Sequence, residues 1–215
     1  MAESARLTTV NVVHAIRRGA GRDTAIDKRP VTGRVPVGTL GLDGDRQCDT
    51  RNHGGPDKAL YAYAGEDAAW WAEQLGRDIP PGLFGDNLTT AGLDVTGALI
   101  GERWRIGGPE GVLVEVRMPR TPCENLSFRM DDPRFHKRFV ASGRVGAYLG
   151  VLEPGTIEAG DPIEIAFRPD HGLTVGGYFD RPDAAVMRKC STPASTSPRP
   201  YVGGSAGSQR ARDTT

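Results

Sequence analysis

The sequence predicts a mainly β fold, a closed or nearly closed β-barrel with a few short helices. Its 215 residues include 29 glycines and 16 prolines, which fall between short β-branched runs. Such spacing is typical of many short strands joined by turns. Several runs alternate apolar and polar residues, as strands do when one face packs on a core. Closure into a barrel would remove the exposed edges that so many strands otherwise leave.

The predicted strands, in chain order, are residues 8–16, 35–40, 58–64, 98–107, 112–119, 147–155 and 161–167. The linkers "GPEG" (108–111) and "TIEAGD" (156–161) contain turn residues, so each predicts a hairpin between the runs that flank it. We therefore expect sequential antiparallel pairing. Two further stretches have helical spacing of their apolar residues, at 66–77 and 132–143.

The chain length suits one domain, which we place at residues 1–175. Residues 176–189 are predicted to be a remnant of a C-terminal helical segment. Residues 190–215 are rich in Ser, Gly, Pro and Thr and contain one aromatic residue. Because such a segment buries too little apolar surface to offset its ordering entropy, it is predicted to be a disordered low-complexity tail.

Charge and cysteine content exclude several classes of function. Lys+Arg and Asp+Glu both count 27, so no overall positive field attracts nucleic acid or an anionic membrane. No stretch of 18 apolar residues occurs, and the N-terminus lacks the pattern of a signal peptide. Three scattered cysteines do not form a disulfide framework. We expect a cytoplasmic protein without a nucleic-acid or membrane partner.

Cys123 lies in the stretch "RMPRTPCENL", directly after a predicted strand. Pro119 and Pro122 stiffen the chain around it and remove two backbone donors. Arg117 and Arg120 are close in sequence and favour a thiolate, the species that ligates soft metals or attacks electrophiles. Because cysteine is also among the most buried residue types, a space-filling role stays open at this point.

Two loops are candidates for ligand binding. In "RNHGGPDK", paired glycines let backbone N–H groups approach an anion, and cationic side chains could donate to a phosphate, so the candidates are Arg51, His53, Gly54, Gly55 and Lys58. The alternative is an ordinary tight turn. In "FGDNLTTAG", Asp86 and Asn87 either brace a turn or bind a polar ring. A zinc site of Cys48, His53, Cys123 and His136 has no CxxC or HxxxH spacing to support it.

Five stretches together resemble a MOSC domain, a module named after the C-terminal part of molybdenum cofactor sulfurase. They occur in the family's order between about residues 8 and 175: "GLDGDRQCDTRNHGGPDKALYAY", "FGDNLTTAG", "IGERWRIGG", "EVRMPRTPCENL" and "VLEPGTIEAGDPIEI". The chain is most similar to the small stand-alone YiiM-like members. The resemblance implies a MOSC barrel, of the kind also called PK β-barrel-like.

The resemblance also implies a cofactor, Mo-molybdopterin, and a role for individual residues. Cys123 would be the protein ligand to molybdenum and the catalytic residue. The loop Arg51–Lys58 would cradle the pterin phosphate, and Asp86 and Asn87 would lie near the cofactor. Arg120 and Asn125 would flank the ligand and orient it.

The implied activity is the removal of oxygen from small N-hydroxylated molecules. Since the chain shows no flavin, haem or iron–sulfur motif, an external electron-donor protein would be needed. The resemblance leaves a homodimer open. Two alternatives remain: a non-catalytic cofactor or sulfur carrier with a persulfide on Cys123, and pyridoxal-phosphate-linked sulfur transfer with Lys58 as the Schiff-base lysine.

Overall fold

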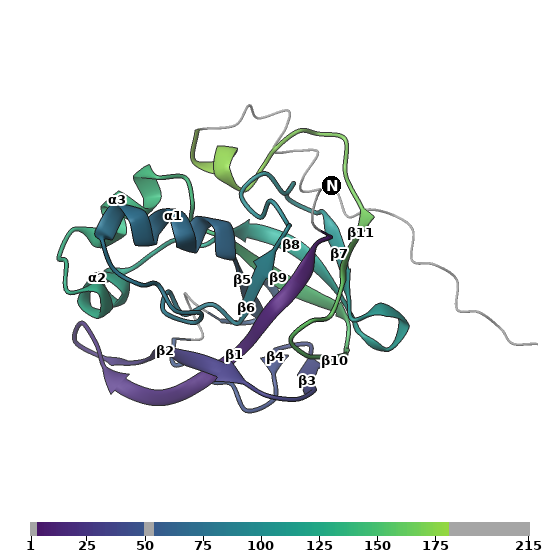
Figure 1. The fold of residues 1–215 in the computed structure, drawn as a ribbon, viewed down its shortest axis with the longest axis horizontal. Helices are drawn as coiled ribbons and strands as arrows, with labels where there is room; N and C mark the ends of the chain where they lie inside the picture. The colour runs from purple at the N-terminus through teal and green to yellow at the C-terminus, as the bar shows by residue number, and fades with distance from the viewer. Residues whose placement is uncertain (1–3, 50–53, 181–215) are drawn as a thin grey trace, which may run out of the picture.

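The computed structural model describes residues 4–49 and 54–180 (Figure 1). Most of the regular elements are strands: β1 (Arg6–Arg18), β2 (Asp23–Val31), β3 (Val35–Gly38), β4 (Gly41–Leu42), β5 (Leu60–Ala64), β6 (Leu88–Ala91), β7 (Arg103–Ile106), β8 (Val112–Pro119), β9 (Ala147–Glu153), β10 (Gly155–Ile157) and β11 (Ile163–Phe167). The helices are α1 (Gly65–Leu75), α2 (Glu124–Met130) and α3 (Phe135–Ala141), with three short 3₁₀ turns at Pro56–Lys58, Gly108–Glu110 and Gly176–Asp180. The predicted mainly β class with short helices is confirmed.

The strands form one large mixed sheet and one small sheet. The large sheet has the order β11-β7-β8-β9-β5-β6-β1-β2, and β10-β3-β4 form the small one. In the large sheet β5 and β6 run parallel, and the other pairs are antiparallel. The helices α1, α2 and α3 lie together beyond one end of the strands (Figure 1).

The large sheet is not closed into a barrel, so the closed form of the predicted barrel is wrong. The start of β1 does reach the segment before β11, because Leu7 N donates to Asp161 O at 2.8 Å and Ile163 N donates to Ala5 O at 2.9 Å. From Val10 onward, however, β2 pairs with that same edge of β1. The start of β11 and the whole of β2 therefore occupy successive parts of the same edge of β1. The sheet curls, but its two end strands do not pair with each other.

Only some of the strands pair with the strand that follows them in the chain, the arrangement that the sequence analysis predicted. The hairpin predicted at "GPEG" is confirmed, because β7 and β8 pair with Ile106 opposite Val112. The hairpin predicted at "TIEAGD" is wrong: β11 pairs with β7, and β10 pairs with β3. The reason is that both edges of β9 are already occupied, by β5 and β8.

Five elements were absent from the sequence prediction: β2, β4, β6, β10 and α2. The β2 sequence "DTAIDKRPV" has four charged residues and a proline, which obscure its strand pattern. Its charges are matched by ion pairs, such as Lys28 with Asp45. Pro30 is tolerated because β2 is the end strand of the sheet, where one edge needs no ladder donor.

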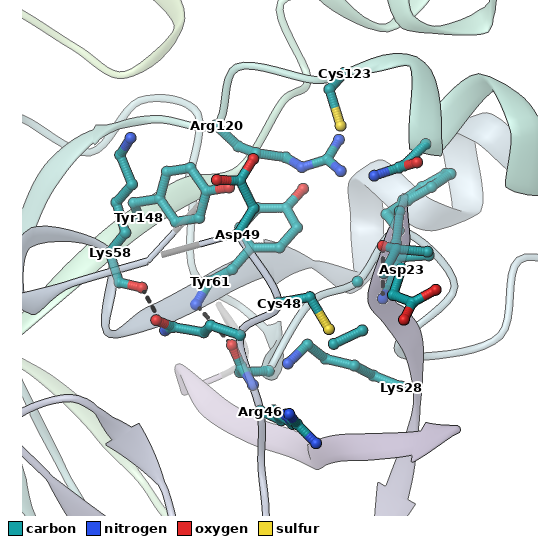
Figure 2. Close-up of a pocket in the computed structure, with 18 residues that line it drawn as sticks. Asp23, Lys28, Arg46, Cys48, Asp49, Lys58, Tyr61, Arg120, Cys123 and Tyr148 are labelled. Carbon is teal, nitrogen blue, oxygen red and sulfur yellow. Dashed lines mark hydrogen bonds between the residues drawn. The ribbon is translucent and has the colours of Figure 1, made fainter. Parts of the chain in front are cut away.

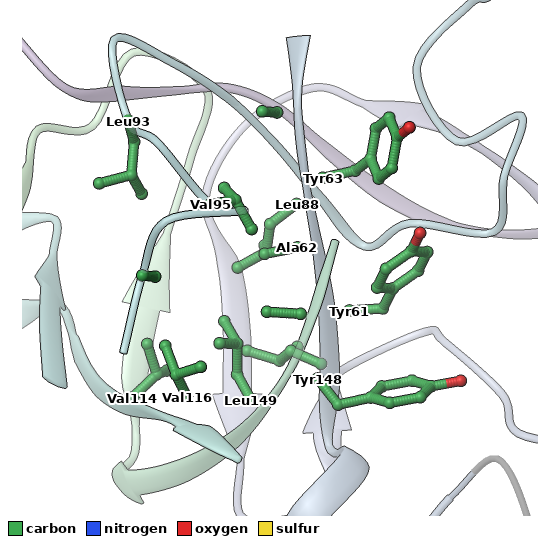
Figure 3. Packing of buried hydrophobic residues seen from close by; sticks show 14 of the residues in the cluster. Tyr61, Ala62, Tyr63, Leu88, Leu93, Val95, Val114, Val116, Tyr148 and Leu149 are labelled. Carbon is green, nitrogen blue, oxygen red and sulfur yellow. The ribbon is translucent and has the colours of Figure 1, made fainter. Parts of the chain in front are cut away.

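The core continues from the sheet into a cluster of aromatic side chains beneath the helices. Inside the sheet, apolar residues from β5, β6, β8 and β9 pack together (Figure 3). Toward the helices, Phe139 of α3 stacks on Trp71 of α1 with ring centroids 5.7 Å apart and an interplanar angle of 15°. Phe139 also contacts Tyr63, Phe84 and Phe135. The predicted helices 66–77 and 132–143 are thus confirmed, but α1 begins one residue earlier and α3 is much shorter, at Phe135–Ala141.

Phe139→Ala should be one of the most destabilising core substitutions. The side chain is fully buried, so its removal leaves a cavity among rings that cannot collapse, at a cost of about 3–5 kcal/mol of unfolding free energy. Urea denaturation followed by tryptophan fluorescence measures this cost. Phe128→Ala is the matched control, because Phe128 is 65% exposed and its loss should change little. Equal effects of the two substitutions would contradict this account of the core.

The predicted C-terminal segments lie mostly outside the described residues. Of residues 176–189, the structure describes only the turn Gly176–Asp180, and residues 190–215 are not described. Within the described part, none of the helices combines the length and the apolar character needed to cross a membrane.

Candidate functional site

A pocket opens where the end strand β2 meets the loop after β4 and the segment between β8 and α2 (Figure 2). Side chains from segments far apart in the sequence line it together. They are Asp23, Thr24, Ala25, Ile26, Lys28, Arg46, Gln47, Cys48, Asp49, Lys58, Tyr61, Phe84, Gly85, Asn87, Arg120, Cys123, Asn125 and Tyr148.

Cys123 is placed on the pocket wall by the end of β8 and the start of α2. The residue occupies the N-cap position of α2 in an extended conformation (φ −119°, ψ 177°), and its carbonyl accepts from Leu126 N at 3.0 Å. It is partly exposed and forms no disulfide. The thiol therefore lies where a ligand in the pocket could reach it.

Arg120 lies beside Cys123 as a buried cation. Its side chain is 5% exposed, and the guanidinium sits over the Tyr61 ring with its carbon 5.3 Å from the centroid. Figure 2 shows the guanidinium directed toward the Cys123 thiol. Burial lowers the pKa of Arg120, but the Tyr61, Tyr148 and Cys123 side chains outweigh it and raise the pKa above its ordinary value. Arg120 is thus charged at every working pH.

One nitrogen of Arg120 has no acceptor among residues 4–49 and 54–180. Its Nη1 atom is buried and makes no hydrogen bond within the described part of the chain. An unsatisfied buried donor is costly, and on a cation the cost is larger. In a pocket wall, such a donor is a position where an acceptor on a ligand would be bound.

Lys28 is a pocket residue that the sequence did not reveal. It is 8% exposed and forms an ion pair with Asp45. Asp45 is fixed in turn, since Val13 N donates to its Oδ1 at 2.9 Å and Asn87 Nδ2 donates to its Oδ2 at 2.8 Å. Burial lowers the pKa of Lys28, and Asp45 opposes this shift. The stretch "AIDK" could have indicated this lysine, because Lys28 follows apolar residues and is buried in β2. The sequence analysis did not predict the strand, so it did not select the lysine.

The structure brings together five of the residues predicted for the cofactor or the metal. Lys58, Asn87, Arg120, Cys123 and Asn125 all line the pocket. Asn87 uses its amide to join other elements, because its Oδ1 accepts from Tyr61 N and its Nδ2 donates to Asn11 O, both at 3.2 Å. Asn125 Oδ1 accepts from Ala20 N at 2.9 Å.

The other predicted residues are placed differently. Arg51 and His53 lie outside the described residues. The pocket lining, within the described ranges, does not include Gly54 or Gly55, and Gly55 N donates to Gln47 Oε1 at 3.2 Å. Asp86 is also absent from the pocket lining.

Asp86 braces three segments instead. Its Oδ2 accepts from Asn11 Nδ2 at 3.2 Å, from Thr89 Oγ1 at 2.7 Å and from Gly82 N at 3.2 Å. The carboxylate is 3% exposed. These contacts fit the bracing alternative of the sequence analysis and not direct contact with a ligand in the pocket.

Asp86 should give the fold a measurable pH dependence. Burial raises its pKa above the ordinary 3.8, and the hydrogen bonds from Thr89 and Gly82 only partly offset this. Since the folded state then holds the proton more tightly than the unfolded state, the stability from this group is present below pH 3.8 and is lost as pH rises through the folded pKa. The difference in unfolding free energy between the wild type and Asp86→Asn (wild type minus variant) should therefore fall as the pH rises above 3.8. A difference that rises with pH in urea titrations would contradict this.

A zinc site is not supported by the described part of the chain. Residues 4–49 and 54–180 contain no group of three His, Cys, Asp or Glu side chains that could hold a metal ion. His136 Nδ1 instead lies 2.7 Å from Ser127 Oγ.

Comparison with known proteins fits this site. Residues 49–164 match the family described as MOSC domain. The chain belongs to the MOSC domain family. Within this MOSC chain, the matched range contains Cys123, Arg120, Lys58 and Tyr148. The wall of the pocket formed by β2, including Lys28, lies before the matched range.

Several relatives are similar over most of this MOSC chain. It is 35% identical over 180 residues to the uncharacterized protein YflK of Bacillus subtilis, covering 81% of this chain and 80% of that one. The crystal structure of YiiM from Geobacillus stearothermophilus superposes with a TM-score of 0.71 and 32% identity, covering 88% and 92% of the two chains. A protein named reductase from Gibberella moniliformis is 34% identical over 164 residues, which is 72% of this chain but 28% of that protein.

Proposed function

We propose that this protein binds the molybdenum cofactor through Cys123 and reduces N-hydroxylated small molecules. The observation that carries the proposal is one pocket wall with a reachable thiol beside a buried guanidinium that has an unused donor. Membership of the MOSC family, which is associated with this cofactor, supports it. So does the name reductase carried by one relative.

The residues present fit the chemistry of the cofactor. Molybdenum in a pterin cofactor already has dithiolene sulfur ligands, so one further soft thiolate completes a suitable set. The cofactor also carries a phosphate and polar ring atoms. Arg120 Nη1, Lys28, Arg46 and Lys58 provide cationic donors around the same pocket. When bound, the cofactor would supply a metal centre that accepts oxygen and exchanges electrons.

The remaining tasks belong to side chains of this chain. Cys123 would anchor the cofactor at the start of α2, and Arg120 would place its positive charge beside that thiol and hold an acceptor atom of the ligand. Lys28, fixed by Asp45, would bind negative charge at the wall formed by β2. Reduction of an N–OH group consumes two electrons and two protons and releases water, so the pocket must also admit protons from solvent.

The decisive experiment compares the full chain purified from two hosts. One host makes the molybdenum cofactor and the other lacks molybdopterin synthesis. We expect molybdenum and pterin near one per chain from the first host only, with reduction of a hydroxylamine or amidoxime confined to that preparation. Absence of molybdenum from both preparations would overturn the proposal.

A further inference from the structure

A concave surface next to the pocket carries a strong positive charge. We call it the basic groove, and its described lining residues are Arg17, Asp27, Lys28, Arg29, Pro30, Pro80, Pro81, Leu83 and Arg129. Lys28 borders both the pocket and the groove, so one residue of β2 joins them. The groove is not needed to explain the binding of a small molecule in the pocket.

The charge of the groove is not neutralised by its own acidic residue. Asp27 is the one carboxylate among its described lining residues, and its side chain is 3% exposed. Three guanidinium groups surround it, with N–O distances of 2.6 Å from Arg17, 3.0 Å from Arg129 and 3.9 Å from Arg29. The Arg17 and Arg29 side chains are 56% and 55% exposed, so the excess positive charge faces solvent.

The groove is built from rigid parts. Its three prolines have fixed φ angles and lack N–H groups, so they form a stiff wall without donors. Arg129 is held from both sides, because its Nε donates to Leu83 O at 2.8 Å and its Nη2 donates to Asp27 Oδ1 at 3.0 Å. A surface that is already ordered loses little entropy when a partner binds.

Two elements connect the groove to the thiol. Helix α2 begins just after Cys123, its N-cap, and carries Arg129 in its last turn. The same helix packs against β2, which bears Lys28 (Figure 1). A partner seated on the groove would thus lie against the outer side of the elements that form the pocket wall.

We propose that the basic groove docks an acidic electron-carrier protein, which supplies electrons one at a time. This inference rests on the proposed function, which needs an external source of electrons. Complementary charge would steer the donor to the groove and orient its cofactor toward the pocket. Two reduced donors would each lose one electron, and with two protons these convert R–NHOH to R–NH₂ and water.

The test uses the full chain with purified flavodoxin as the probe. Binding is measured by calorimetry, independently of turnover, for the wild type, Arg29→Glu and Arg17→Gln/Arg29→Glu. We expect affinity to fall roughly tenfold or more in the double variant and to weaken with salt in the wild type. Reduction rates with flavodoxin should fall in parallel, while rates with reduced methyl viologen, a small donor, should not change.

Arg105→Glu is the matched control, because Arg105 lies on β7, is not among the lining residues of the groove, and is also paired with a carboxylate. The docking proposal is overturned if the wild-type protein does not bind flavodoxin. It is also overturned if the control weakens binding as much as the groove variants do. A third contradicting result would be a change in the self-association of the groove variants, measured by light scattering, that accounts for their weaker binding. Groove-dependent binding by protein without molybdenum would support docking while the proposed reductase function failed.

Discussion

Cys123→Ser is expected to reduce the molybdenum content of the purified protein to below about one tenth of the wild-type value, because a serine hydroxyl is neither soft nor ionised at neutral pH. Pterin should be lost with the metal. Reductase activity should fall to the level of protein from the host without cofactor. Elemental analysis and pterin fluorescence measure the two contents on the same samples.

Cys48→Ser is the control for that experiment, since Cys48 is an exposed thiol that lines the same pocket. It should retain molybdenum and activity. If molybdenum were lost only in Cys48→Ser, the metal ligand would be Cys48, and the role proposed for Cys123 would be wrong. A persulfide on Cys123 in protein that never contains molybdenum would instead favour a sulfur carrier, and mass spectrometry of the intact chain detects it as an added sulfur.

Arg120→Met should separate stability from cofactor binding. Methionine has a similar length and no charge, and replacement of a buried charged group by an apolar one of similar volume is often neutral or stabilising. The melting temperature should therefore stay the same or rise. Molybdenum content should nevertheless fall roughly tenfold, because the free donor of Arg120 and its charge beside Cys123 are both removed.

The same variant predicts a change in thiol chemistry that needs no cofactor. Without the guanidinium, the Cys123 thiolate loses a neighbouring positive charge, so alkylation by iodoacetamide at neutral pH should slow several-fold. Cys123 and Cys48 can be followed separately by peptide mapping. If Arg120→Met keeps its molybdenum and its alkylation rate, Arg120 serves only to pack the aromatic rings beneath it.

The sequence predicted part of the pocket because some of its signals are local. The prolines around Cys123 and the neighbouring arginines are all within "RMPRTPCENL", so this stretch made Cys123 a candidate. The resemblance to the MOSC family then selected Cys123 and Arg120 together. Asp86 and Asn87 were also selected as cofactor-binding residues. Although they are neighbours in the sequence, the structure gives them different roles. Asn87 reaches the pocket lining, whereas Asp86 turns to Asn11 and Thr89.

The sequence by itself determined the mainly β class, most of the strands and the family. These depend on alternation of residues, on turn chemistry and on motif order, all of which are properties of short stretches. Only the tertiary structure decided that β2 is a strand, that Lys28 faces the Cys123 pocket and that the sheet stays open. The physical reason is that each of these depends on a partner distant in the chain: Asp45 makes burial of Lys28 tolerable, and β2 occupies the edge of β1 that a closed barrel would need.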